Sequence, residues 1–292
     1  MRLPQLEYVV AIAEEGSYTA ASTRLRIAQP SLSQQVAVLE KELGCQLFER
    51  LHRGVRLTPA GRAFLPEARA TVLAARRARR AARAATQLDG ATLEIATLGS
   101  IAIGVLPDAV SAWRRVHPDV AVNVVSYPHR DALEAAVASG VGDLAIGTPP
   151  RRWSGETTIL GREEFVVILP ADDPAARAQR IGLASLAERE WVAFDRDHGL
   201  AEWLYAECAR AGFRPKLAAQ LAEVAAVVRL AAAGVGPAFV PSNVVPAGLD
   251  AAVRGLRRPV YRDIAAYART RPPHQAGPLL DSLPGALEQS AR

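Results

Sequence analysis

A long helical pattern early in the chain constrains the fold more than any other feature of the sequence. Thr58 can cap and Pro59 can begin a helix that continues to about Leu88, where Asp89 and Gly90 end it. At 1.5 Å per residue this helix is a rod of roughly 45 Å. Because such a rod separates the residues before it from the residues after it, the 292-residue chain is expected to hold a small N-terminal domain and a larger C-terminal part.

Small side chains repeat along this rod at heptad spacing. The seam consists of Phe64, Ala68, Thr71, Ala75, Ala78, Ala82 and Ala85. Steps of four and three residues are typical of a coiled-coil seam, and small residues let two helices approach closely, so the pattern predicts a dimer through this helix. A basic line, formed by Arg62, Arg69, Arg76 and Arg83, runs beside it. It faces either DNA or solvent, and we favour solvent because cations near a helix C-terminus complement the helix dipole.

The positive charge of the chain is concentrated in the segment that ends with this helix. The chain has 35 Lys and Arg against 30 Asp and Glu, and residues 1–88 account for 14 of the former and 7 of the latter. A polyanionic partner is therefore expected to bind the N-terminal part. Arg abundance alone is weak support, since Lys occurs only at Lys41 and Lys216.

Residues 1–58 carry the start and stop signals of three short helices. Apolar residues at helical spacing predict a first helix that ends near Glu15, and Gly16 with Ser17 ends it and caps the second. The third helix begins near Pro30 and stops at Gly44. Its apolar stripe consists of Leu32, Val36, Leu39 and Leu43.

The opposite face of the third helix begins with uncharged groups that can form hydrogen bonds at base edges. These are Gln29, Pro30, Ser31, Ser33, Gln34 and Gln35. Taken alone, the pattern fits a polar surface on a small helical bundle equally well. The next run along the chain favours a nucleic-acid interface, because Arg50, Arg53 and Arg56 surround a glycine turn between apolar residues, the pattern of a basic hairpin or wing.

Five short motifs follow one another between Leu6 and Gly61. They are Gly16-Ser17-Tyr18-Thr19-Ala20-Ala21, Gln29-Pro30-Ser31-Leu32-Ser33, Leu39-Glu40 with Leu43-Gly44, Leu47-Phe48-Glu49-Arg50, and Leu57-Thr58-Pro59-Ala60-Gly61. In this order they resemble the winged helix-turn-helix of LysR-type transcriptional regulators. The resemblance implies a sequence-specific regulator that binds double-stranded DNA at an interrupted inverted repeat, as a homodimer or homotetramer. It implies residues 1–58 as the DNA-binding domain and residues 59–90 as the linker and dimerisation helix.

The same resemblance assigns roles within the N-terminal domain. The third helix enters the major groove, where Ser33 and Gln34 read bases, and the wing arginines chiefly contact phosphate, which gives affinity rather than sequence choice. Ser17 and Thr19, at a helix N-terminus, hold a further phosphate. The expected DNA-binding residues are Ser17, Thr19, Gln29, Pro30, Ser31, Ser33, Gln34, Arg50, Arg53 and Arg56.

From Thr92 onwards, short apolar strands alternate with helices, which predicts a mostly parallel α/β domain. The expected strands include Leu93–Thr97, Val120–Val125, Leu144–Ile146, Phe165–Leu169, Trp191–Phe194 and Ala238–Val240. The resemblance implies that residues 91–292 form an effector-binding domain like periplasmic solute-binding proteins. Its two α/β subdomains, about 91–162 with 268–292 and about 163–267, surround a cleft. The expected fold class is therefore an α+β multidomain chain: a winged helix-turn-helix, a long linker helix and a two-subdomain α/β domain.

A small anionic effector is expected in that cleft, because ligands of such sheets bind beyond the strand C-termini. Gly99 and Ser100 follow one strand at a helix N-terminus, and Arg151 and Arg152 lie just beyond another. The expected effector-binding residues are Gly99, Ser100, Ile101, Gly147, Thr148, Phe194, Asp195 and Glu223. An equal alternative, for each of these residues alone, is that Ser100 and Thr148 merely cap local backbone and that Arg151 and Arg152 are solvated. The convergence of several strand ends favours a site.

Other classes of protein fit less well. The histidines, at His52, His117, His129, His198 and His274, include no pair at metal-ligand spacing, so neither an enzyme nor a metal or other cofactor is expected. A solute-binding protein of a transport system would have no use for the basic wing. A DNA-architectural protein would leave the α/β domain unexplained. Two distant cysteines, Cys45 and Cys208, fit buried hydrophobic positions in a reducing cytosol. The uncharged run 230–249 contains three prolines, so no membrane helix is expected and the location is expected to be cytoplasmic.

Overall fold

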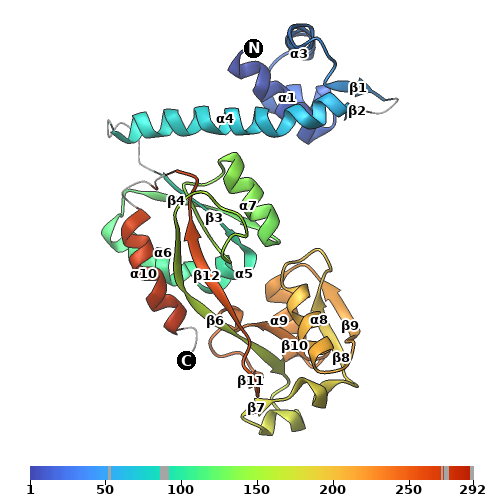
Figure 1. Ribbon diagram of the computed structural model, residues 1–292, viewed down its shortest axis with the longest axis vertical. Helices are drawn as coiled ribbons and strands as arrows, with labels where there is room; N and C mark the ends of the chain where they lie inside the picture. The colour runs from blue at the N-terminus through green and yellow to red at the C-terminus, as the bar shows by residue number, and fades with distance from the viewer. Residues whose placement is uncertain (52–53, 86–91, 271, 273–275, 290–292) are drawn as a thin grey trace. The chain divides into compact units, whose positions relative to one another are not determined.

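The computed structural model describes residues 1–51, 54–85, 92–270, 272 and 276–289, and the chain divides into two compact units, Met1–Ala91 and Thr92–Arg292 (Figure 1). Helices and one hairpin form the N-terminal unit. Its elements are α1 (Leu3–Glu15), α2 (Tyr18–Leu25), α3 (Gln29–Leu43), β1 (Phe48–Arg50), β2 (Val55–Leu57) and α4 (Pro59–Ala85).

The boundaries expected for the first three helices are confirmed. Gly16 ends α1 and Gly44 ends α3, both in the left-handed conformation, and the Ser17 side chain caps α2. The core of the unit joins the three helices to the hairpin through Val9, Ile12, Ala21, Leu32, Val36, Leu39, Leu47 and Phe48. Leu43 was expected to complete the apolar stripe of α3, but it lies in the last turn, past this small core, and is 37% exposed.

The long helix α4 packs along α1, which corrects the prediction of one continuous dimer seam. Ala68 and Val72 are buried against Leu6 of α1, and Phe64 packs beside them. The first part of the seam therefore packs against α1 of the same chain and is not available to a second chain. Farther along, Ala75 is half-buried and the side chains of Thr71, Ala78 and Ala82 are exposed. The expected end near Leu88 lies outside the described residues.

The C-terminal unit is built on a mixed sheet, in which two strands serve both halves, and on a separate two-stranded sheet. Its elements are β3 (Thr92–Leu98), α5 (Gly99–Gly104), α6 (Leu106–Val116), β4 (Ala121–Tyr127), α7 (Arg130–Ser139), β5 (Leu144–Gly147), β6 (Thr157–Leu169), η1 (Pro174–Arg177), β7 (Arg180–Ile181), η2 (Leu183–Leu186), β8 (Glu190–Phe194), α8 (Ala201–Arg210), β9 (Lys216–Leu221), α9 (Val224–Ala232), β10 (Ala238–Pro241), η3 (Ser242–Val244), β11 (Ala252–Leu256), β12 (Tyr261–Tyr267) and α10 (Ala276–Gln289).

The sheet order, β4-β3-β5-β12-β6-β11-β7 with β10 also paired to β6, shows how the halves are joined. β3 is parallel to β4 and β5, whereas β12 is antiparallel to both β5 and β6. β6 then continues antiparallel to β10 and β11. β6 and β12 are therefore the two strands that cross between the halves (Figure 1). The expectation of mostly parallel strands holds for β3 with β4 and β5, for β7 with β11, and for β8 with β9, which form a separate two-stranded sheet.

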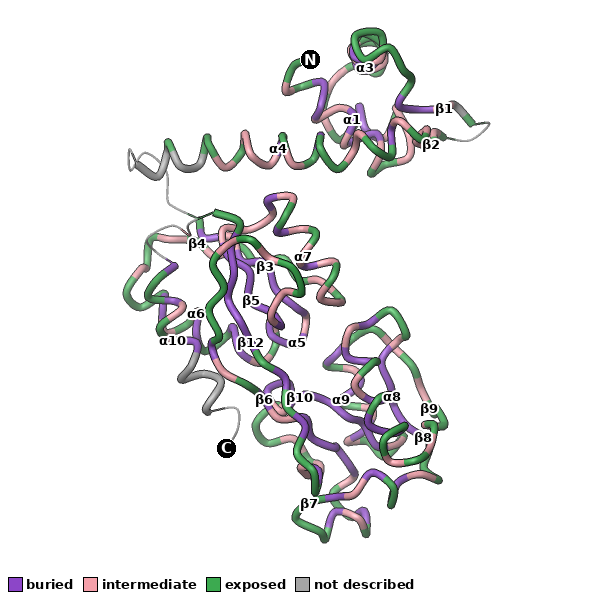
Figure 2. Tube along the Cα trace, in the orientation of Figure 1, coloured by how far each residue is buried: buried purple, intermediate pink, exposed green. Residues whose placement is uncertain are grey.

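Each half of this unit has its own apolar core. Most strands that contribute to the two cores are drawn in purple, the colour of buried residues, in Figure 2. Trp113 is buried in one core and Trp191 in the other. Cys208 is fully buried on α8, as expected. Cys45 was expected to be buried but is exposed, because it follows the end of α3 outside the core. No helix in the described part of the chain is long and apolar enough to cross a membrane.

Candidate functional sites

The N-terminal turn of α3 presents polar side chains without a capping side chain before it. Ala28 precedes the helix and offers no side-chain hydrogen bond, while Gln29, Pro30, Ser31 and Gln34 are exposed. Ser33 is half-buried, and its hydroxyl accepts a hydrogen bond from Nε2 of Gln29 at 2.9 Å. Gln34 thus offers an amide directly to a partner, whereas Ser33 and Gln29 are already joined.

The two residues expected to hold a phosphate near α2 differ in how free their side chains are. The Ser17 hydroxyl accepts a hydrogen bond from the backbone N–H of Ala20 at 3.4 Å, which is a capping role. Thr19 is exposed in the first turn of α2. Thr19 is therefore the better placed of the two to contact a ligand in solution.

The hairpin expected after α3 is present as β1 and β2. Arg56 is exposed, and its Nε donates a hydrogen bond to Glu49 at 2.7 Å, which holds the pKa of Glu49 below its usual range. An exposed pair of this kind is easily opened by a phosphate. Arg53 lies outside the described residues, and the structure describes only the backbone of Arg50. The backbone N–H of Val55 donates to the carbonyl of Gly16, so the hairpin is tied to the turn between α1 and α2.

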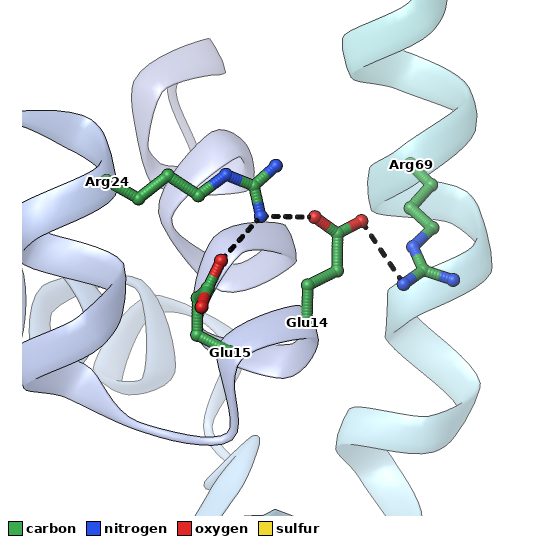
Figure 3. A network of polar contacts seen from close by, with 4 residues as sticks. All are labelled: Glu14, Glu15, Arg24 and Arg69. Atoms are coloured by element: carbon green, nitrogen blue, oxygen red, sulfur yellow. Dashed lines mark hydrogen bonds and ion pairs between the residues drawn. The ribbon is translucent and has the colours of Figure 1, made fainter.

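The basic line of α4 is partly neutralised inside the unit. Arg69 and Arg24 both donate hydrogen bonds to Glu14 of α1, and Arg24 also reaches Glu15 (Figure 3). Arg76 lies 4.0 Å from Glu7. These exposed ion pairs connect α1 with α2 and α4, so Arg69 and Arg76 of the basic line face acidic side chains of the same unit.

A polar cavity of about 310 Å³ lies in the C-terminal unit, where segments of its two halves meet. It is lined by Leu98, Gly99, Ser100, Pro128, His129, Arg130, Asp131, Thr148, Arg151, Arg196, Asp197, His198, Gly199, Leu200, Glu202, Trp203 and Arg262. Four of these residues are arginines and three are carboxylates, so the lining favours a polar ligand with negative charge. Among the described residues, no group of three or more His, Cys, Asp or Glu is placed to hold a metal ion.

The cavity contains some of the residues expected to bind an effector and not others. Gly99, Ser100, Thr148 and the charge partner Arg151 line it, whereas Arg152 does not. The remaining expected residues, which lie outside the lining, are Ile101, Gly147, Phe194, Asp195 and Glu223. Ile101, Gly147 and Phe194 are buried, and Asp195 lies at the start of the loop that does reach the cavity. The helix after Gly99 is only six residues long, so side chains rather than a helix terminus define this end.

The hydroxyls of Ser100 and Thr148 are each held by an arginine. Arg262 Nη2 donates to Ser100 Oγ at 2.7 Å, and Arg130 Nε donates to Thr148 Oγ1 at 3.0 Å. Each hydroxyl therefore serves as an acceptor and keeps its own proton for a ligand. Arg262 and Ser100 are 4% and 2% exposed, so this pair lies at the buried base of the cavity.

Two histidines face the cavity from opposite halves. Nδ1 of His129 accepts from the N–H of Ala132, and Nδ1 of His198 accepts from the N–H of Leu200, both at 3.1 Å, which leaves Nε2 of each ring to donate. Burial, with the nearby charge of Arg262, lowers the pKa of His198. The halves touch beside these rings, where the N–H of Gly199 donates to Pro128.

Arg262, Arg130, Trp203 and both histidines were not predicted as site residues. His198 lies between the expected Asp195 and the start of α8, so the sequence pointed to the loop but not to the side chain that lines the cavity. Arg262 could not be found from the sequence, because it is one of 35 Lys and Arg and lies far along the chain from Ser100. Only the pairing of β12 with β6 brings it to the cavity.

Comparison with known proteins matches both units. Residues 3–62 match the model of the bacterial regulatory helix-turn-helix protein, lysR family, and residues 86–283 match the LysR substrate binding domain. The chain is 31% identical over 282 residues (96% of this chain, 88% of the relative) to a probable hydrogen peroxide-inducible genes activator of Mycobacterium avium. It is 32% identical over 250 residues (84% of each) to the HTH-type transcriptional regulator ClcR of Pseudomonas putida.

Solved structures agree over the whole chain. The crystal structure of CbnR, a LysR family transcriptional regulator, has a TM-score of 0.72 at 26% identity and covers 100% of both chains, as does full-length CbnR complexed with its target DNA. A variant of full-length OxyR from Pseudomonas aeruginosa has a TM-score of 0.71 at 25% identity, covering 97% of this chain and 94% of that one. Members of the family are regulators rather than enzymes. The chain belongs to the LysR family and is a DNA-binding transcriptional regulator with an effector-binding domain.

Proposed function

We propose that this regulator binds an interrupted inverted repeat in double-stranded DNA as a dimer or a dimer of dimers, and that a small anionic molecule in the cavity controls it. Residues 1–58 contact DNA, residues 59–90 link and dimerise, and residues 91–292 bind the effector. Acting on DNA, it works in the cytoplasm of a bacterium. The observation that carries the effector assignment is the arginine-rich cavity with Ser100 and Thr148 at its wall.

The DNA-binding surface is formed by the exposed start of α3 with the wing beside it. Gln34 and its neighbours present amide and hydroxyl groups for base edges, and Arg56 presents charge for phosphate. The other proposed contacts are Ser17, Thr19, Gln29, Pro30, Ser31, Ser33, Arg50 and Arg53. CbnR, a relative of the same fold, has been solved in complex with its target DNA.

The test uses DNA from the region upstream of the gene itself and of its neighbours. Fluorescence anisotropy in the presence of random competitor should show specific binding to one fragment. Gln34→Ala should relax the base preference by about 1–3 kcal/mol at one position of each half-site. Equal competition by random and promoter DNA would refute the assignment.

Peroxide sensing is the competing hypothesis, because the Mycobacterium avium relative is a probable hydrogen peroxide-inducible genes activator. The residues do not favour it here. Among the described residues that line the cavity there is no cysteine or methionine, and burial raises the pKa of Cys208 to about 12, the opposite of what a peroxide-reactive thiol requires. In the native protein, a thiol reagent should modify the exposed Cys45 alone, and peroxide should leave promoter binding unchanged. Oxidation of Cys208 by peroxide, with a change in promoter binding, would support the competing hypothesis.

A further inference from the structure

The base of the cavity holds a buried ion pair between the two crossing strands. Arg262 of β12 and Glu163 of β6 are directly opposite each other in the antiparallel register, so their side chains share one face of the sheet. Nε of Arg262 donates a hydrogen bond to Oε1 of Glu163. The side chains are 3% and 1% exposed, so the Glu163 carboxylate is nearly cut off from water and the Arg262 guanidinium meets water only on the side of the cavity.

The guanidinium of Arg262 has contacts on three sides. Its Nη2 donates to the Ser100 hydroxyl, its central carbon lies 5.7 Å from the centre of the Phe165 ring, and its remaining side lines the cavity. A planar guanidinium has five N–H donors, so these contacts leave donors for a ligand. An anion in the cavity can therefore reach the same cation that Glu163 holds.

The carboxylate of Glu163 is satisfied on one side only. Its Oε2 atom is buried and has no hydrogen-bond partner within the described part of the chain. Burial raises the pKa of this carboxyl group, although the charge of Arg262 opposes the shift. The counter-charge of Arg262 is therefore the nearby Glu163 carboxylate, which is only partly hydrogen-bonded. A second anion can perturb such a pair.

We propose that Arg262 is an anion-binding residue of the effector cavity and that Glu163 is a built-in competitor that sets its affinity. With the cavity empty, Glu163 neutralises Arg262; a bound anion shares the guanidinium and weakens the Glu163 contact. The pair joins the two strands that cross between the halves. Binding of an anion in the cavity therefore changes a contact within the connection between the halves. This inference rests on the proposed function, since it assigns the charge control of the same cavity.

The test measures binding of inorganic sulfate to the full-length protein at constant ionic strength. Trp203 lines the cavity and stacks on Phe165 at 4.7 Å, so its fluorescence reports the site, and Trp203→Phe identifies its part of the signal. Glu163→Gln keeps the shape and one acceptor but removes the competing charge. It should bind sulfate about tenfold more tightly, the equivalent of one pKa unit of charge interaction.

Glu164→Gln is the matched control. It removes the same charge from the next residue of β6, where Glu164 pairs with the exposed Arg180 and not with the cavity. Its sulfate affinity should stay within about twofold of wild type, as for an exposed pair. The double variant Glu163→Gln/Arg262→Gln leaves no uncompensated buried charge and should lose saturable sulfate binding at Trp203. Equal gains in the two single variants, or sulfate binding retained by the double variant, would overturn the inference.

The same variants separate this inference from the proposed function. Promoter DNA binding without sulfate is measured for each of them. Specific promoter binding with unaltered sulfate affinity in Glu163→Gln would refute the role of Glu163 alone. Absence of promoter discrimination in wild type would refute the proposed function whatever the sulfate result.

Discussion

Gly54 of the wing lies against the carbonyl oxygen of Gly16, so closely that a Cβ atom at Gly54 would be 2.7 Å from it. Gly54 also has a φ of 81°, a conformation that residues with a side chain rarely adopt. The N–H of Val55 bonds to the same carbonyl. The wing is thus positioned on the turn that ends α1, and glycine is required there for two separate reasons.

Gly54→Ala should therefore destabilise the fold by about 1–3 kcal/mol and weaken DNA binding further by displacing the wing. Gly44→Ala is the control, because Gly44 has a φ of 69° but no atom of the described residues within 4 Å of the added Cβ. It should cost about 1 kcal/mol through backbone strain alone and leave DNA affinity nearly unchanged. Urea denaturation and DNA anisotropy measure the two effects. Similar losses of DNA affinity in both variants would contradict a positioning role for the Gly54–Gly16 contact.

Salt dependence should distinguish arginines that meet phosphate from arginines that hold the fold. Arg56→Ala should reduce the slope of log affinity against log salt by about one unit if Arg56 contacts a single phosphate. Arg69→Ala should leave the slope unchanged, because Arg69 is paired with Glu14 of α1. The measurement is promoter binding across a series of salt concentrations. A reduced slope for Arg69→Ala would instead indicate that the basic line of α4 contacts DNA.

Local signals in the sequence were sufficient to place the three short helices of the N-terminal unit. Glycines marked the ends of α1 and α3, which depend on a left-handed backbone conformation that few other residues adopt, and a serine cap marked the start of α2. The apolar pattern of α4 was less informative. A stripe of Phe64, Ala68 and Ala75 shows that one face is covered but not whether α1 or a second chain covers it.

The cavity could be predicted only in part, for a topological reason. Ser100 and Thr148 follow β3 and β5, and strand ends of a parallel sheet meet at one edge, so sequence order alone brought them together. Arg262 and Glu163 lie on strands that cross between the halves. Their meeting depends on the antiparallel register of β6 and β12, which has no local sequence signal.

Stability should fall in mild acid because of His198. Burial and the charges of Arg262 and His129 lower the pKa of His198, against Asp195 and Glu223, which raise it. As pH falls through about 6.5, the unfolded chain binds the proton before the folded one does, so the free energy of unfolding decreases. His198→Asn should reduce this loss in urea denaturation between about pH 7.5 and about pH 5.5. An identical pH dependence in the variant would show that other groups cause it.

The exposed half of α4 remains the best candidate for the dimer contact. Phe64 and Ala68 are occupied by α1, but Ala75 is half-buried and Ala78 lies exposed one turn farther on. Ala75→Glu should place like charges against each other across the two-fold axis and shift the protein toward monomer in sedimentation equilibrium.

Ala63→Glu is the control for this change, because Ala63 is exposed on α4 outside the seam. It should leave the dimer intact. Promoter affinity should fall in Ala75→Glu alone, since separate monomers lose the gain of engaging two half-sites together. A dimer that persists in Ala75→Glu would place the contact elsewhere, in the Thr92–Arg292 unit, and the exposed half of α4 would then be a solvated helix.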